Sequence, residues 1–147
     1  VVCEELGLTA DRVHVIVDTM RELDTGQTTA SRSTVLGGRA ILEAAKKLAL
    51  DGIHAEVVNV ATVKPLDEAA ILRSAGRTGH VMTVEDHSIH GGLGSAVAEL
   101  LGEVMPTPMK RIGVTTFGES GDYKGLYAKH GLDADGIAGA VRKFLGR

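Results

Sequence analysis

The sequence predicts an α/β fold with three layers, in which helices cover both faces of a mainly parallel sheet of about four strands. Strand-like and helix-like segments alternate along the 147 residues, as they do in parallel-sheet proteins. The apolar content of 44% rests on aliphatic residues, since aromatics make up only 3%. Neither a repeat nor a low-complexity linker interrupts the chain, so we expect residues 1–147 to form one domain of ordinary size.

Four segments are predicted to be strands from the alternation of strand-like and helix-like segments, and the second has the β-branched run of a strand buried on both faces. They are residues 13–17, 53–60, 80–85 and 110–114. We expect the sheet order 2-1-3-4 with right-handed crossovers, which places residues 13–17 between the second and third strands.

The longest predicted helix follows the first strand and a polar loop over residues 18–30. Its apolar side chains recur at i, i+3, i+4 and i+7, which gives one stripe facing the sheet. These residues are Ile41, Ala44, Ala45 and Leu48. Ser31 or Ser33 is the expected cap at the start of this helix, and Gly52 is expected to end it.

Three further helices are expected. The first is predicted to begin at Pro65 and to end near Gly76, and the last is predicted to be capped by Asp133. The middle helix is predicted to bury Ala96, Val97, Leu100, Leu101 and Val104 and to close at Pro106 and Pro108. The apolar face of the last helix consists of Ile137, Ala138, Val141, Phe144 and Leu145.

Composition and charge argue against several kinds of partner. The net charge is -3 and no run of Lys or Arg occurs, so we expect no nucleic-acid partner and no membrane surface. No apolar stretch reaches the roughly 18 residues of a membrane span. Cys3 is the single cysteine, which excludes an intrachain disulfide and favours a reducing, cytoplasmic location.

Three blocks of sequence carry a family resemblance over about residues 50–147. The first is Thr-Val-Lys-Pro-Leu-Asp at 62–67, and the second is Thr-Val-Glu-Asp-His at 83–87 with the glycine-rich run 90–99. The third is Thr-Phe-Gly-Glu-Ser-Gly at 116–121. Together they resemble the C-terminal domain of transketolase-like thiamine diphosphate enzymes. The resemblance implies that the glycine-rich block lies near dimer contacts, so a homodimer is the assembly that we expect if the chain self-associates.

A different resemblance covers about residues 1–48. The run Thr-Thr-Ala-Ser-Arg-Ser-Thr at 28–34, followed by Arg-Ala-Ile-Leu-Glu-Ala-Ala at 39–45, is similar to the molybdopterin-binding part of molybdenum hydroxylases of the xanthine dehydrogenase and aldehyde oxidase type. Two parent families in one chain predict a chimera, engineered or recombined, with its join inside the helix near residues 44–50.

The cofactor motifs of both parent families are missing from this chain. In the thiamine diphosphate family, other domains hold Mg²⁺ and diphosphate through a Gly-Asp-Gly motif, and the nearest approach here is Gly-Asp-Tyr at 121–123. We therefore expect no cofactor, no enzymatic activity and a non-catalytic structural domain. A non-catalytic subunit domain of a split transketolase is an alternative.

The start of the long helix is the candidate ligand site. Ser31, Arg32, Ser33 and Thr34 combine hydroxyls, a cation and the unpaired N–H groups of a helix start, which suits weak binding of phosphate or a phosphorylated ligand. The resemblance to molybdenum hydroxylases implies a similar location near the pyranopterin phosphate. The alternative is that Ser and Thr only cap the helix.

Other candidate sites are weaker. The glycines at 91, 92 and 94 do not complete the dinucleotide-binding motif Gly-x-Gly-x-x-Gly, because Val97 stands at its last position. Close packing of the helix on the neighbouring strand explains these glycines without a nucleotide. Phosphate binding at this helix start is the alternative. Glu85, Asp86, His87 and His90 cluster in sequence but lack a further strong ligand, so no metal is expected. Ser120 does not lie in a nucleophile elbow, and no catalytic residue is assigned.

Overall fold

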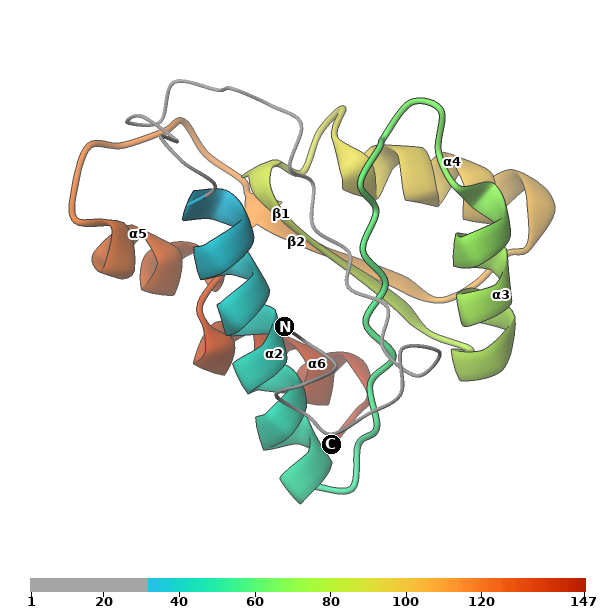
Figure 1. The fold of residues 1–147 in the computed structure, drawn as a ribbon, viewed down its shortest axis with the longest axis horizontal. Coiled ribbons are helices and arrows are strands. Elements are labelled where there is room, and N and C mark those ends of the chain that lie inside the picture. The colour runs from blue at the N-terminus through green and yellow to red at the C-terminus, as the bar shows by residue number, and fades with distance from the viewer. Residues whose placement is uncertain (1–31) are drawn as a thin grey trace.

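A computed structural model describes the backbone of residues 32–147 and the side chains of residues 38–147. The predicted strand at 13–17, and Ser31, lie outside the described residues. The described elements are α2 (Arg32–Leu50), α3 (Glu68–Thr78), β1 (Val81–Ser88), α4 (Leu93–Val104), β2 (Met109–Val114), α5 (Tyr123–His130) and α6 (Ala134–Phe144) (Figure 1). None of these helices is long and apolar enough to cross a membrane.

The two described strands pair in parallel. Val81 pairs with Met109 and Val84 with Ile112, and a register shift follows before Ser88 pairs with Val114. The strands predicted at 80–85 and 110–114 are thus confirmed, and so is their parallel direction, which the crossover through α4 permits.

Residues 53–60, in contrast, form no strand ladder, so the described part of the chain holds a sheet of two strands rather than about four. Ile53, Val58 and Val60 are nevertheless buried, as the β-branched pattern predicts. The pattern predicts burial but not a hydrogen-bonding partner. The neighbour expected for this segment is residues 13–17, outside the described residues.

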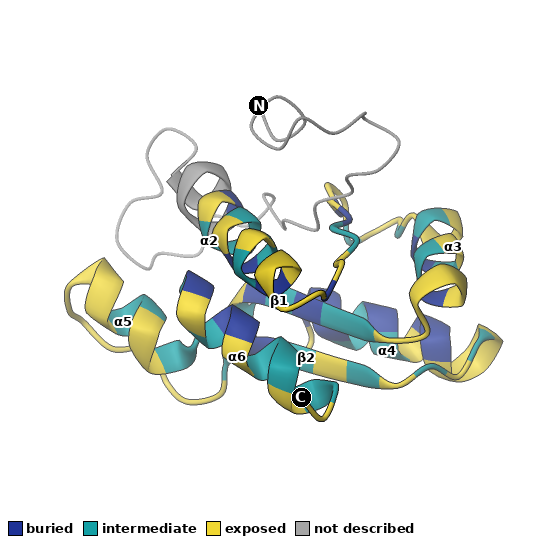
Figure 2. Cartoon of the chain, turned by 90° about the horizontal axis from the view of Figure 1, so that it is seen from below, coloured by how far each residue is buried: buried dark blue, intermediate teal, exposed yellow. Residues whose placement is uncertain are grey.

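Helices cover both faces of the strand pair, as the predicted three-layer architecture requires. Thr83 and Glu85 of β1 point toward α4, whereas Val84 packs with α2 and α6. Figure 1 shows α3 and α4 on one side of the strands and α2 with α6 on the other. Buried positions on these helices face the interior (Figure 2). On the side of α3 and α4, the buried core consists of residues from both helices and from the segment before α3: Val58, Val60, Ile71, Ala75, Leu93, Val97, Leu100 and Leu101.

The apolar stripe of α2 packs against α6, which confirms the predicted faces of both helices. Ala44 and Leu48 are buried in one cluster with Ile53, Ile137 and Ala138. The chain leaves α2 through Gly52, whose φ of 73° suits glycine. Asp133 caps α6 as predicted, with its carboxylate accepting the N–H of Gly136 at 2.8 Å.

Two predicted boundaries of α3 were wrong. The helix begins at Glu68 rather than Pro65 because the side chain of Asp67 accepts the N–H of Ala70 at 3.0 Å and so occupies the N-cap. It continues through Gly76 and ends at Gly79, whose φ of 70° gives a left-handed C-cap.

The predicted apolar face of α4 is correct except at its end. Val97, Leu100 and Leu101 are buried, but Val104 is 59% exposed. Helical periodicity places Val104 on the same stripe, yet no described element covers the last turn of α4, where residues 102–104 are all exposed.

Candidate functional site

The second and third sequence blocks meet at one edge of the sheet. Because β1 and β2 are parallel, their carboxyl ends lie together, and the N–H of Ile89 after β1 donates to the carbonyl of Val114 at 3.1 Å. The loop over residues 89–92 leads from this edge into α4, and residues 115–122 lead into α5. In α/β proteins this is the edge at which ligands commonly bind.

Glu85 is the buried polar centre of this edge. Only 2% of the residue is exposed, and its Oε1 accepts the backbone N–H of Gly94 at 2.9 Å. The N-cap of α4 is Gly92, which has no side chain to accept a helix N–H, so a carboxylate from the preceding strand takes over this function. The carboxyl group also lies at the positive end of the α4 dipole.

Sequence reasoning missed this role, since it considered Glu85 only as a metal ligand. One signal was available: the helix starts at Gly-Gly-Leu-Gly without Ser, Thr, Asp or Asn at its cap, so its N–H groups need an acceptor from elsewhere in the fold.

Three glycines allow Glu85 to fit. A Cβ at Gly94 would lie 2.6 Å from Glu85 Oε1 and 2.8 Å from Thr83 Oγ1, and one at Gly113 would lie 2.7 Å from the carbonyl oxygen of His87. Gly92 likewise faces the Glu85 carboxylate. The expected close approach of helix and strand is confirmed. The alternative of a phosphate at the Gly94 helix start loses support, because Gly94 already donates to Glu85.

A second set of contacts fixes the loop between β1 and α4. Arg111 Nη1 donates to the carbonyl oxygen of Ile89 at 2.9 Å and to Ser95 Oγ at 3.3 Å. Ser95 Oγ also accepts the N–H of Gly91 at 2.9 Å. The half-buried guanidinium therefore holds the loop against β2, so that the edge presents a defined shape.

His87 lies in β1 and His90 in the loop that follows. His87 Nδ1 lies 2.8 Å from the carbonyl oxygen of Ser88, and His90 is exposed. In the described part of the chain, no three side chains of the His, Cys, Asp and Glu types gather closely enough to hold an ion.

Thr83 offers a test of packing around Glu85. Its Oγ1 is buried and has no hydrogen-bond partner among the described residues. We expect Thr83→Val to raise the free energy of unfolding by about 1 kcal/mol, because the near-isosteric side chain removes an unsatisfied hydroxyl. Urea denaturation measures the effect. Thr83→Ser, which keeps the hydroxyl and loses the methyl group, should destabilise, and a destabilising Thr83→Val would contradict this account.

Tyr127 connects α5 to the end of β1. Its hydroxyl donates to Asp86 Oδ2 at 2.7 Å. Burial, followed by the hydrogen bond to Asp86, raises the pKa of Tyr127 well above its ordinary value.

A raised pKa makes the contribution of Tyr127 to stability depend on pH. The folded state retains the phenol proton at a pH where the unfolded state releases it, so the contribution is complete below about pH 10 and falls as the pH rises above that value. We expect Tyr127→Phe to destabilise by about 1 kcal/mol at neutral pH. The difference in unfolding free energy from the wild type should narrow in alkaline buffer, and a difference independent of pH would argue against the hydrogen bond.

The third sequence block is exposed throughout residues 116–121, and Phe117 is 97% exposed. Its Glu119 carboxylate accepts from Lys129 Nζ at 2.6 and 2.7 Å, and this hydrogen bond and the charge of Lys129 lower the pKa of Glu119. The aromatic ring therefore stands on a loop tethered to α5.

The described residues do not fit a diphosphate and Mg²⁺ site. Asp122, in the nearest approach to a Gly-Asp-Gly motif, uses Oδ2 to accept the N–H of Gly125 at 3.1 Å and so caps α5.

The phosphate site predicted at the start of the long helix remains a prediction. α2 begins at Arg32, so Arg32, Ser33 and Thr34 lie in its first turn as expected, and that turn contains no acidic residue. Ser31 and the side chains of the other three residues lie outside what the structure describes.

Two family models match the sequence. Residues 38–137 match the one described as transketolase, C-terminal domain, and residues 1–64 match the one described as molybdopterin cofactor-binding domain. Both resemblances found in the sequence are thus supported. The matches share residues 38–64, so they do not define a boundary near residue 48.

Relatives and a solved structure agree with the first match. The 6-deoxy-6-sulfo-D-fructose transketolase subunit SqwH of Clostridium sp. (strain MSTE9) is 49% identical over 83% of this chain and 38% of its own length. The 1-deoxy-D-xylulose-5-phosphate synthase 1 of Geobacter sulfurreducens is 48% identical over 71% of this chain and 17% of its own length. The solved structure of a split gene transketolase, an inactive beta4 tetramer, has a TM-score of 0.70 at 46% identity, covering 76% of this chain and 37% of that one.

These relatives overturn the prediction that the chain has no enzymatic role. They are named as transketolase subunits and synthases, and the chain spans between 17% and 38% of their lengths. The absence of the cofactor motif from this chain was not a valid argument, because in enzymes of this type other domains can carry that motif. With residues 38–137 matched and its three sequence blocks within the described fold, the chain belongs to the transketolase C-terminal domain family.

Proposed function

We propose that the chain serves as the C-terminal domain of a transketolase-type enzyme, as a subunit domain that supplies assembly contacts while other domains bind the cofactor. The exposed 116–121 block carries this proposal. It is one of the three blocks that resemble the family, yet none of its residues is buried, so its sequence does not serve the core. A contact with another domain or subunit would explain why the 116–121 block includes an almost fully exposed aromatic ring.

Phe117 is the proposed anchor of this contact. Aromatic side chains that enter a partner's pocket contribute a large share of interface energy. Phe117 follows the carboxyl end of β2 by three residues, and Arg111 of the same strand holds the loop after β1. A homodimer formed through the carboxyl edge of the sheet is the simplest assembly, and the similar split gene transketolase is itself a tetramer.

The test replaces the matched segment of SqwH with the corresponding residues of this chain and measures assembly by sedimentation and transketolase activity with the partner components. We expect the graft to assemble and retain activity. Phe117→Ala should weaken assembly by about tenfold or more without changing the melting temperature.

Leu50→Ala is the matched control, because Leu50 is also an exposed apolar residue, 89% exposed at the end of α2. It should leave assembly unchanged. A graft that folds, as judged by circular dichroism, but does not assemble would refute the proposed function. Equal effects of the two substitutions would refute the assignment to Phe117.

The mixed ancestry also remains a proposal. The match of residues 1–64 to the molybdopterin cofactor-binding domain supports it. The weak phosphate site at Ser31–Thr34 likewise rests on sequence and on the start of α2 at Arg32. A chemical-shift titration with phosphate tests it: shifts confined to residues 26–36 would support the site, and the absence of shifts at millimolar phosphate would leave only helix capping.

A further inference from the structure

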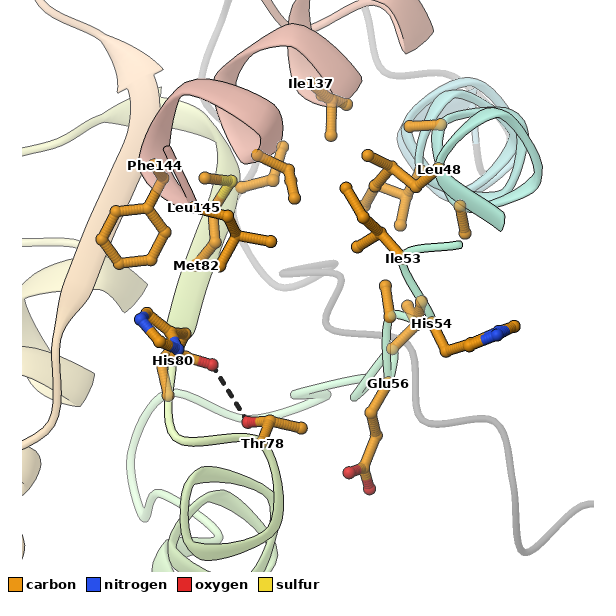
Figure 3. Close-up of a pocket in the computed structure, with 18 of the residues that line it drawn as sticks. Leu48, Ile53, His54, Glu56, Thr78, His80, Met82, Ile137, Phe144 and Leu145 are labelled. Carbon is orange, nitrogen blue, oxygen red and sulfur yellow. Dashed lines mark hydrogen bonds between the residues drawn. The ribbon is translucent and has the colours of Figure 1, made fainter. Parts of the chain in front are cut away.

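Three of the four Phe and Tyr residues of the chain lie in one stretch of sequence. Phe117, Tyr123 and Tyr127 fall within residues 115–131. The fourth, Phe144, lines the apolar cavity between α2, β1 and α6 (Figure 3). No residue of 115–131 lines that cavity or belongs to either of the two core clusters. The aromatic residues of this stretch therefore do not serve the interior of the described fold.

Residues 115–131 form a segment without a buried residue, although they include the helix α5. Both flanking positions are fixed in the fold, since Val114 pairs with Ser88 in the sheet and Leu132 is buried. Figures 1 and 2 show α5 at one end of the molecule, away from α3 and α4. A segment with few buried apolar contacts opens at a lower free energy than the core of the same protein.

Several contacts join parts of this segment to one another. The rings of Tyr123 and Tyr127 meet edge to face with their centroids 6.3 Å apart. Glu119 accepts from Lys129, and Asp122 caps α5. All these contacts can persist when the segment moves as a whole.

Among the described residues, one side-chain hydrogen bond joins the segment to the rest of the fold. It is the bond from the Tyr127 hydroxyl to Asp86 Oδ2, at 2.7 Å, and Asp86 lies in β1. The N–H of Leu132 also donates to the carbonyl oxygen of Tyr127 at 2.8 Å, but this bond closes the end of α5, where the two residues are near neighbours in the chain. Tyr127 therefore holds α5 to the sheet.

We propose that residues 115–131 act as a strap, which opens from the rest of the fold as one unit, and that the Tyr127–Asp86 hydrogen bond is its latch. Opening exposes side chains that are only half-buried, those of Leu126, Tyr127 and His130, and it breaks no strand pairing. Phe117 belongs to the strap, so a partner that binds Phe117 also holds the strap closed. This consequence for assembly rests on the proposed function, whereas the opening of the strap does not.

Hydrogen exchange of the native full chain at low urea concentrations tests the opening. We expect the amides of α5 to exchange faster than those in the middle of α4, with rates that depend little on urea, because opening the strap exposes little surface. Ile137→Val weakens the core outside the strap and should speed exchange in α4 about fivefold while leaving α5 unchanged. Equal rates and equal urea dependence in α4 and α5 would overturn the proposal, because the segment would then open only with the whole fold.

Tyr127→Phe and Tyr123→Phe form a matched pair that tests the latch. Each removes one hydroxyl from α5, but the Tyr123 hydroxyl has no hydrogen-bond partner among the residues that the structure describes. Tyr127→Phe should speed exchange of the α5 amides about fivefold, and Tyr123→Phe should leave their exchange unchanged. Equal effects of the two substitutions would contradict the assignment of the latch.

The exchange measurements need no partner, so they decide on the strap whether or not the proposed assembly forms. In the assembled graft with SqwH, exchange of the α5 amides should be slower than in the isolated chain, because a contact at Phe117 stabilises the closed strap. Exchange that is equally fast in both would overturn this consequence for assembly. A graft that does not assemble would count against the proposed function and leave the measured strap opening intact.

Discussion

Gly94→Ala should destabilise the protein by about 2–3 kcal/mol, although alanine is the better helix former. The added methyl group would lie 2.6 Å from Glu85 Oε1, 2.8 Å from Thr83 Oγ1 and 2.8 Å from Arg111 Cδ, so the start of α4 must move away from the strands. That movement also weakens the bond between the Gly94 N–H and the buried carboxylate. Urea denaturation with far-ultraviolet circular dichroism gives the change in unfolding free energy.

Gly102 provides the control within the same helix. A Cβ there meets nothing within 4 Å, and the residue is exposed. Gly102→Ala should therefore stabilise by about 0.5 kcal/mol through helix propensity alone. Opposite signs for the two substitutions are the expected result. A stabilising Gly94→Ala would show that α4 does not pack on β1 as closely as described.

Glu85→Ala should destabilise by about 3 kcal/mol, because the truncation removes the acceptor of the Gly94 N–H and leaves a space among Gly92, Gly94 and Gly113. Such a loss is a large part of the stability of a domain of this size. Glu85→Gln keeps an acceptor oxygen of similar shape and should destabilise less than Glu85→Ala. Thermal and urea unfolding of the purified full chain would measure both.

Glu99→Ala is the matched control, since Glu99 is an exposed carboxylate in the middle of the same helix. It should change the unfolding free energy by less than about 0.5 kcal/mol. Similar losses at Glu85 and Glu99 would mean that the buried carboxylate does not organise the start of α4.

The features predicted correctly from the sequence are those encoded within short windows. The stripe of α2 follows from spacings of three and four residues, and the cap of α6 needs only Asp133 and an N–H three residues later. β1 and β2 lie where the alternation of strand-like and helix-like segments predicts strands, and the three blocks were sufficient to identify the family. The sequence also indicated why Gly94 is a glycine, through close packing of helix on strand.

Features that depend on contacts between separate segments required the tertiary structure. Glu85 caps α4 only because β1 brings its carboxylate to a helix start nine residues later, a contact that no local spacing specifies. Residues 53–60 have the composition of a strand but no ladder with β1, because burial is encoded locally whereas pairing needs a neighbour. Val104 continues an apolar stripe yet is exposed, since its burial depends on whether another element covers the last turn of α4. Local periodicity thus determined which faces are apolar, and only the packed structure decided what each face meets.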